Sequence, residues 1–233
     1  HHINRDSFYE IGRQIASSGF EFLGCEGFID LNGENGNLPA LDNVIEKNGY
    51  KVFYGLDEYN RNKKTKNVVL CQPSKKEKSA ENYAIESKSS EDMKLEQMLE
   101  TAIGHLGDEK PFFIMCEGGA IDWEAHSNRT MGTVNETLEF NKAVEVAYQF
   151  YLAHPNETLI VVTADHETGG MALGNSDYVL NLKVLAEQKC SSDMLSDQLS
   201  ALHKREGEYL GWEQVKEVIV SNTGLYAAVE MTD

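Results

Sequence analysis

The sequence predicts an α/β fold with a mostly parallel central sheet and helices on both faces. Apolar strand-like runs alternate with helix-like patterns as far as residue 164, which is the arrangement expected of a sheet covered by helices. The strongest run, "TLIVVTA" at residues 158–164, is continuous and rich in β-branched residues, as is typical of a strand buried on both faces. The chain has 233 residues, of which 41% are hydrophobic, so it can bury a sizeable core.

The first part of the chain repeats a helix, a glycine stop and a strand. Residues 5–19 carry apolar side chains at amphipathic helical spacing, and Gly19 ends the pattern. Residues 38–49 repeat this helix and end on a second glycine. Short apolar runs predict strands at three places: "FEFLG" (20–24), "YKVFY" (50–54) and "NVVLC" (67–71).

Two further units continue this alternation. A helix pattern at residues 93–107 leads into the run "FFIMC" at 112–116, and a longer one at 135–152 leads into the run at 158–164. Residues 72–92 are polar and rich in Ser and Lys, which predicts a solvated loop.

The pattern changes after Gly174, where helix follows helix without clear strands. These helix patterns cover residues 178–188, 193–207 and 212–224. We therefore predict a partial α/β core at residues 1–174 and a helical insertion or cap at residues 175–233.

Charge and composition exclude several classes of partner. The 38 acidic residues against 21 Lys and Arg give a formal charge of −17, whereas nucleic acids and anionic membranes require a basic face. No apolar run approaches the roughly 18 residues that cross a bilayer. We therefore expect neither a nucleic-acid nor a membrane partner, while bound cations suit the acidic balance.

The cysteines and the N-terminus add two expectations. The four cysteines lie far apart without a Cys-x-x-Cys pair, which predicts free thiols and neither a zinc ribbon nor a redox motif. The chain starts without an initiator Met or a signal peptide, as expected of an excised fragment.

Polar side chains follow two of the predicted strands at their carboxyl ends. Glu117 comes directly after the run at 112–116, and Asp165 and His166 come directly after the run at 158–164. Ligands of open α/β sheets bind at this edge, because strand ends and helix starts meet there. Asp122 and His126 are four residues apart, so a helix places both on one face, where they can grip one ion.

Each pair taken alone is also compatible with a simpler role. An ion pair on a helix surface explains Asp122 and His126 equally well, and Asp165 could cap a helix. The joint pattern favours metal binding, because glycines accompany both pairs where backbone crowds a site. Two metals about 4 Å apart would suit in-line phosphoryl displacement.

These residues also carry a resemblance to a known family. "FFIMCEGGAIDWEAHSN" and "VVTADHETGG" resemble the metal-binding segments of alkaline phosphatases, and "HHINRDSFYEIGRQI" resembles the stretch with their phosphate-gripping arginine. The resemblance covers roughly residues 5–170. It implies three sets of metal ligands: Asp122 and His126 for one zinc ion, Asp165 and His166 for a second, and Glu117 for magnesium. It also implies that Arg5 clamps phosphate with its planar guanidinium group.

The chain departs from the family pattern at both ends. The family's serine nucleophile lies before the arginine, where this chain has four residues, so no catalytic nucleophile is expected here. Ser7 follows Arg5 inside a helix start and is interpreted as local helix chemistry. The family's last zinc-binding histidine lies in a Gly-His-Thr-Gly segment that this sequence lacks, and His203 is interpreted as a surface residue.

The sequence therefore predicts the central fragment of a metal-dependent phosphate monoester hydrolase, inactive or nearly so alone. The resemblance implies incomplete sites for zinc and magnesium, a phosphate monoester substrate, a possible homodimer, and a periplasmic or extracellular location. One alternative is a fragment of a related phosphodiesterase, sulfatase or phosphomutase, which differ in the nucleophile. Another is a noncatalytic acidic module that binds metal or a partner.

Overall fold

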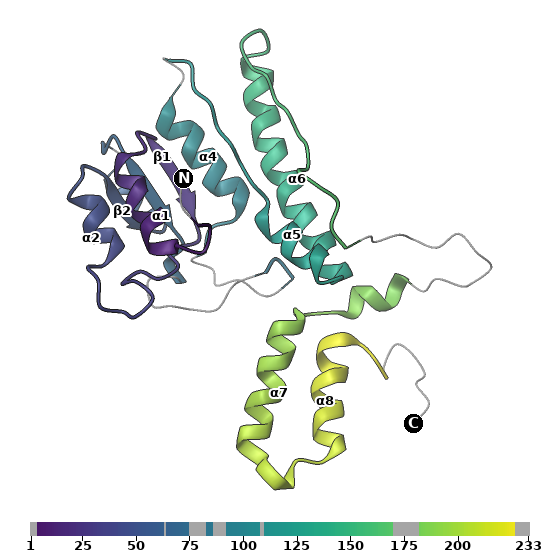
Figure 1. Ribbon diagram of the computed structural model, residues 1–233. Helices are drawn as coiled ribbons and strands as arrows, with labels where there is room; N and C mark the ends of the chain where they lie inside the picture. The colour runs from purple at the N-terminus through teal and green to yellow at the C-terminus, as the bar shows by residue number, and fades with distance from the viewer. Residues whose placement is uncertain are drawn as a thin grey trace. The chain divides into compact units, whose positions relative to one another are not determined.

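The computed structural model describes residues 4–62, 64–74, 83–85, 92–107, 110–169 and 182–226 (Figure 1). The chain divides into two compact units, which we describe separately. The first unit consists of residues 1–81, 89–116 and 142–158, and the second of residues 82–88, 117–141 and 159–233.

The first unit contains a three-stranded parallel sheet in the order β1-β3-β2. Its elements are α1 (Phe8–Gln14), the 3-10 helix η1 (Ile15–Ser17), β1 (Phe22–Cys25), α2 (Leu41–Glu46), β2 (Lys51–Tyr54), α3 (Leu56–Asn60), β3 (Val68–Cys71) and α4 (Leu95–Leu106). The central strand, β3, is buried along its whole length. Predicted strands at 20–24, 50–54 and 67–71 are confirmed to within two residues.

Side chains of β3 alternate between two apolar clusters, one on each face of the sheet. Val69 and Cys71 pack with Leu41 of α2 and with α1, whereas Val68 and Leu70 pack with residues of α3 and α4. Burying a Val or Leu side chain stabilises a fold by about 1.5–3 kcal/mol, so this strand anchors both layers of helices. The predicted α/β class, with helices on both faces of a parallel sheet, is confirmed.

The prediction of strands at 112–116 and 158–164 is wrong, because neither segment forms a strand. A β-strand requires a hydrogen-bonded neighbour, and the sheet of the described residues consists of β1, β2 and β3. The first segment keeps a strand-like alternation, since Phe112 packs on Phe150 at 5.6 Å between ring centroids while Phe113 remains 86% exposed. Leu159 in the second segment is also 86% exposed.

The helices after residue 116 are α5 (Gly119–His126), α6 (Thr130–Ala153), η3 (Leu182–Glu187), α7 (Ser192–Glu206), η4 (Gly207–Tyr209) and α8 (Trp212–Thr223). The predicted helix at 135–152 is confirmed but starts earlier, and α6 runs from the second unit into the first. The predicted helices at 193–207 and 212–224 correspond to α7 and α8. None of the described helices is long and apolar enough to cross a membrane.

Local sequence explains where α7 and α8 begin and end. The hydroxyl of Ser191 accepts a hydrogen bond from the Met194 N–H at 3.1 Å, which caps α7. Gly224 ends α8 in the left-handed conformation, with φ of 71°, which favours glycine. The two helices pack together, and Nδ2 of Asn222 in α8 donates a hydrogen bond of 2.8 Å to Oε1 of Gln198 in α7.

Several predictions lie partly or wholly outside the described residues. The boundary at 174/175 lies there, so the division into a core and a helical insertion stays a prediction. Most of the polar loop at 72–92 lies there as well, and of the predicted helix at 178–188 the structure describes a 3-10 helix at 182–187.

Candidate metal centre

Helix α5 positions the first two side chains of the site. The chain turns into α5 at Gly118, where a Cβ atom would approach Ile121 and Phe140 to 2.9 and 3.0 Å, so a larger residue would crowd the turn. Asp122 and His126 then follow on successive turns of α5 and share one face.

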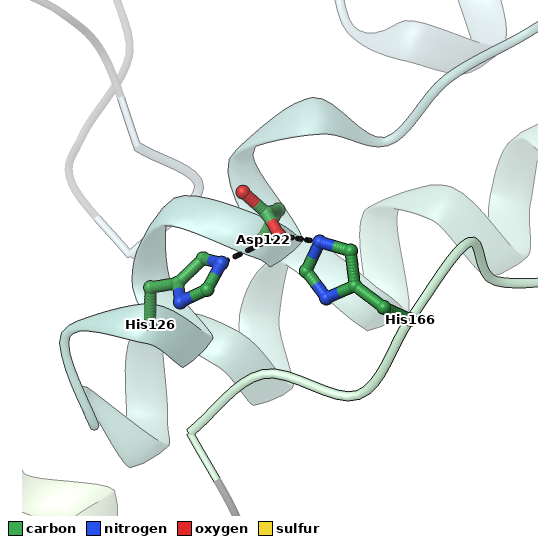
Figure 2. A group of neighbouring side chains, drawn as sticks. All are labelled: Asp122, His126 and His166. Carbon is green, nitrogen blue, oxygen red and sulfur yellow. Dashed lines mark ion pairs between the residues drawn. The ribbon is translucent and has the colours of Figure 1, made fainter.

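The structure brings His166 to the same place from the segment that follows residue 158 (Figure 2). Oδ1 of Asp122 lies 3.3 Å from Nε2 of His126 and 3.5 Å from Nε2 of His166. The two imidazole rings are 5.4 Å apart between centroids. One ligand atom from each of the three residues therefore lies within 4.8 Å of the others.

A second glycine lets the His166 segment approach α5. A Cβ atom on Gly169 would overlap the carbonyl oxygen of Ala125 and crowd the side chain of Asn128. Both groups lie at the C-terminal end of α5, so the close approach that places His166 requires glycine at this position.

The geometry of these three side chains fits a metal ion. Oδ1 of Asp122 is buried, yet it accepts no hydrogen bond from any residue that the structure describes. The two imidazole nitrogens form ion pairs with this oxygen only when they are protonated, and with neutral histidines a bound cation would compensate for its burial. Zinc bonds of about 2.0–2.1 Å in a tetrahedral arrangement place ligand atoms about 3.3–3.4 Å apart, which is close to the two distances from Oδ1 of Asp122.

Hydrogen bonding at His166 leaves its Nε2 atom directed at Asp122. Nδ1 lies 2.7 Å from the carbonyl oxygen of Glu167, to which it donates as N–H. This hydrogen bond, together with the nearby charge of Asp165, raises the pKa of His166. Metal-binding histidines commonly donate their second ring N–H to a carbonyl in this way, which fixes the orientation of the ring.

The other predicted site residues are placed differently. Asp165 is 89% exposed at its side chain, and its Oδ2 lies 3.7 Å from Nε2 of His166. Glu117 is exposed just before α5. Arg5 is exposed in a turn before α1 and belongs to the first unit. The structure thus groups His166 with Asp122 and His126, and the roles of Asp165, Glu117 and Arg5 stay predictions.

Sequence reasoning missed a charged network that supports the same helix. Glu124 of α5 is fully buried and accepts a hydrogen bond of 3.0 Å from Nη1 of Arg129. Arg129 also binds Asp193 of α7 at 2.9 and 3.0 Å. Gly132 leaves room for this carboxylate, because a Cβ atom there would overlap Oε2 of Glu124. Glu124 and Arg129 are five residues apart. Side chains that pair on one helix face are three or four residues apart, so the sequence spacing did not predict this ion pair.

Comparison with known proteins identifies similar sequences and folds. The family model described as alkaline phosphatase matches residues 46–231. The repressible alkaline phosphatase of Saccharomyces cerevisiae is 27% identical over 243 aligned residues, which cover 97% of this chain and 38% of that protein.

Solved alkaline phosphatases share the fold. The structure from the Antarctic bacterium TAB5 has a TM-score of 0.62 at 25% identity, covering 76% of this chain and 50% of that one. A TAB5 variant described with Mg bound in its M3 site has a TM-score of 0.56 at 26% identity, covering 73% and 47%. A cold-active enzyme from Shewanella has a TM-score of 0.66 at 22% identity, covering 93% and 53%, and is similar in fold alone. The chain thus spans no more than about half the length of these relatives.

Proposed function

The chain belongs to the alkaline phosphatase family, and on that premise we propose that it carries part of the metal-dependent active site of a phosphate monoester hydrolase. One observation carries the proposal: the buried Oδ1 of Asp122 faces two imidazole nitrogens at 3.3 and 3.5 Å. A surface ion pair would not explain why two histidines from separate segments meet one carboxylate oxygen.

Asp122, His126 and His166 are the residues that we propose to hold a zinc ion. Imidazole nitrogen with carboxylate oxygen in a tetrahedral arrangement is a ligand set that zinc accepts. Zinc bound there supplies Lewis-acid polarisation of a phosphoryl oxygen and lowers the pKa of an attacking oxygen nucleophile. The sequence analysis assigned His166 to the second zinc ion together with Asp165. The present proposal assigns it to the first zinc ion, with Asp122 and His126.

The chain's own residues fix the geometry of this site. Helix α5 holds Asp122 and His126 at a constant spacing, so two ligands are oriented before any ion binds. In the neutral ring, the hydrogen bond from His166 to the Glu167 carbonyl holds the proton on Nδ1, which leaves the lone pair of Nε2 directed into the site. Asp165 remains our proposed ligand for a second zinc ion, Glu117 for magnesium, and Arg5 the proposed phosphate-binding residue.

We further propose that the nucleophile lies in a part of the protein beyond these 233 residues. Each relative described above is about twice as long as the matched part of this chain or longer. Ser7 stands at the N-cap position of α1, where its side chain makes no capping hydrogen bond, and we interpret it as part of the helix start and not as the nucleophile. The isolated chain would therefore bind metal and phosphate weakly and turn over little substrate. A phosphate monoester substrate, a homodimer and a periplasmic or extracellular location belong to the same proposal.

Zinc titration by calorimetry tests the metal site directly. We expect Asp122→Ala and His166→Ala each to weaken zinc binding at least ~10-fold, because each removes one of three ligands. Asp165→Ala should weaken it much less, since this side chain is exposed and lies outside the three-residue group. His203→Ala, on the exposed surface of α7, is the matched control and should bind zinc as the parent chain does. Equal affinity in all four variants would refute the site.

A further inference from the structure

Two thiols lie next to each other at the carboxyl ends of β1 and β3. The register of the parallel ladder pairs Cys25 directly with Cys71, so both side chains project from the same face of the sheet. Their Sγ atoms are 3.7 Å apart. Cys71 is fully buried in the cluster that includes Val69 and Leu41, and Cys25 packs against the edge of that cluster and is half-buried.

The register of this pair and the contact between its sulfur atoms are compatible with a disulfide. Neighbouring strands lie about 4.7–4.9 Å apart, which is inside the Cα separation of about 4.4–6.8 Å that disulfides adopt. Because the register already aligns the two residues, no strand has to slide along its neighbour. Rotation of the two side chains about χ1 would bring the sulfur atoms to bonding distance, about 2.05 Å.

The two thiols also differ in exposure, which suits stepwise oxidation. Their sulfur atoms share one hydrogen bond in which either thiol can be the donor, and burial acts to raise the pKa of both. The thiolate is the attacking species in thiol–disulfide exchange, and access governs the rate. Cys25, which is half-buried, is therefore the thiol that reacts first, and Cys71 is the thiol that resolves.

We propose that Cys25 and Cys71 form a reversible disulfide that links β1 to β3 and acts as a redox-controlled staple of the first unit. The oxidant is a small-molecule disulfide such as glutathione disulfide. The Cys25 thiolate attacks one sulfur of the oxidant, forms a mixed disulfide and releases one small thiolate. Cys71 then gives its proton to the released thiolate, and its sulfur attacks Sγ of Cys25 and releases the second small thiolate.

The exchange balances without any other reactant. Two protein thiols lose two electrons and become one disulfide, while the small disulfide gains them and becomes two thiols. The two protons of the protein thiols end on the two released thiols. A reducing thiol drives the same steps backwards, so the state of the pair follows the redox poise of the surroundings.

The linkage would affect the stability of the first unit. It closes a loop between positions 46 residues apart, which contains α2, β2 and α3. Closing such a loop restricts the unfolded chain, so the oxidised form should unfold at higher temperature than the reduced form.

Redox titration of the whole chain tests the proposal. The purified protein is equilibrated in glutathione buffers of increasing oxidising strength, quenched with acid, alkylated in denaturant, digested and mapped by mass spectrometry. We expect a cross-linked peptide pair carrying Cys25 and Cys71, lighter than the two reduced peptides by two hydrogen atoms. Cys116 and Cys190 should remain alkylated under the same buffers.

Matched variants separate the staple from general thiol oxidation. Cys116→Ala should keep both the cross-link and the rise in unfolding temperature on oxidation, whereas Cys25→Ala should lose both. Three results would overturn the proposal: both thiols alkylated in the most oxidising buffer, Cys25 trapped as a mixed disulfide with glutathione, or a cross-link to Cys116 or Cys190. Mapping of the parent chain decides among these even if a variant fails to fold.

Discussion

Arg129 binds Asp193 with both terminal nitrogens of its guanidinium group, at 3.0 and 2.9 Å, although the two residues are 64 positions apart. The same Nη1 donates to the fully buried Glu124. Burial acts to lower the pKa of Arg129, but hydrogen bonds to Asp193 and Glu124 outweigh it and raise the pKa. One cation thus joins α7 to α5, the helix that carries Asp122 and His126.

Removing this cation should destabilise the second unit strongly. Arg129→Met leaves the Glu124 carboxylate buried without its cation, so we expect the free energy of unfolding to fall by about 3 kcal/mol. Asp193→Asn should cost about 1 kcal/mol or less, because that carboxylate is 61% exposed. Urea unfolding followed by circular dichroism measures both changes. Arg13→Met is the control, because the side chains of Arg13 and of its partner Glu10 are each 53% exposed. An equal loss of stability in all three variants would contradict this account.

Gly132 should tolerate no side chain, even though it lies in a helix. Alanine in a helix is usually favoured over glycine by about 0.5–1 kcal/mol, but here its Cβ would overlap the buried carboxylate of Glu124. We therefore expect Gly132→Ala to destabilise the chain in urea unfolding. Gly104→Ala in α4 is the matched control, because no atom lies within 4 Å of the position that its methyl group would take, and it should stabilise. Stabilisation by both changes would show that Glu124 moves aside.

Stability should fall in alkaline solution partly through Tyr59. Burial raises the pKa of Tyr59, whose hydroxyl lies 3.0 Å from Nδ1 of His105. Above the ordinary tyrosine pKa of about 10, the unfolded chain loses this proton while the folded chain keeps it, so stability decreases as pH rises. In urea unfolding at pH 9 and pH 11, Tyr59→Phe should show a smaller decrease than the parent. Tyr148→Phe, on the exposed surface of α6, should behave as the parent does, and a parent-like decrease in Tyr59→Phe would count against the assignment.

Catalysis should be very weak in the isolated chain. With zinc and magnesium added, we expect an aryl phosphate ester to be hydrolysed at least ~1000-fold more slowly than by a full-length family member, as when a nucleophile is removed. Positioning of the reacting groups supplies much of the rate in phosphoryl transfer. Release of the aryl alcohol gives the rate. A rate like that of a complete enzyme, abolished by Ser7→Ala, would identify Ser7 as the nucleophile and refute the proposal of a missing one.

The sequence predicted well those features that depend on neighbouring residues. Gly19 and Gly49 end their helix patterns with φ of 77° and 93°, backbone conformations that favour glycine. Asp122 and His126 were placed on one helix face by their spacing alone. The strand expected at 112–116 failed because pairing depends on a neighbouring strand, which the period of one segment does not reveal.

Features that depend on tertiary contacts were beyond the sequence patterns. His166 meets Asp122 because the segment after residue 158 passes the end of α5 at Gly169, and no spacing along the chain encodes that approach. The pairing of Cys25 with Cys71 depends on the register of β1 against β3. The four cysteines are free thiols in the structure, as expected. Their wide separation along the chain gave no indication that Cys25 and Cys71 are in contact.

The apolar segments at 112–116 and 158–164 have a practical consequence for handling the chain. Phe113, Met115, Leu159 and Val161 are each at least 74% exposed, and both segments are uncharged and free of proline. Short uncharged segments of high β-propensity are the sequences that assemble into cross-β aggregates when exposed. The chain should therefore self-associate as its concentration rises, with light scattering that charged substitutions at Phe113 and Val161 suppress. Solubility, and not folding of the parallel sheet, would then limit the concentration at which the chain can be studied.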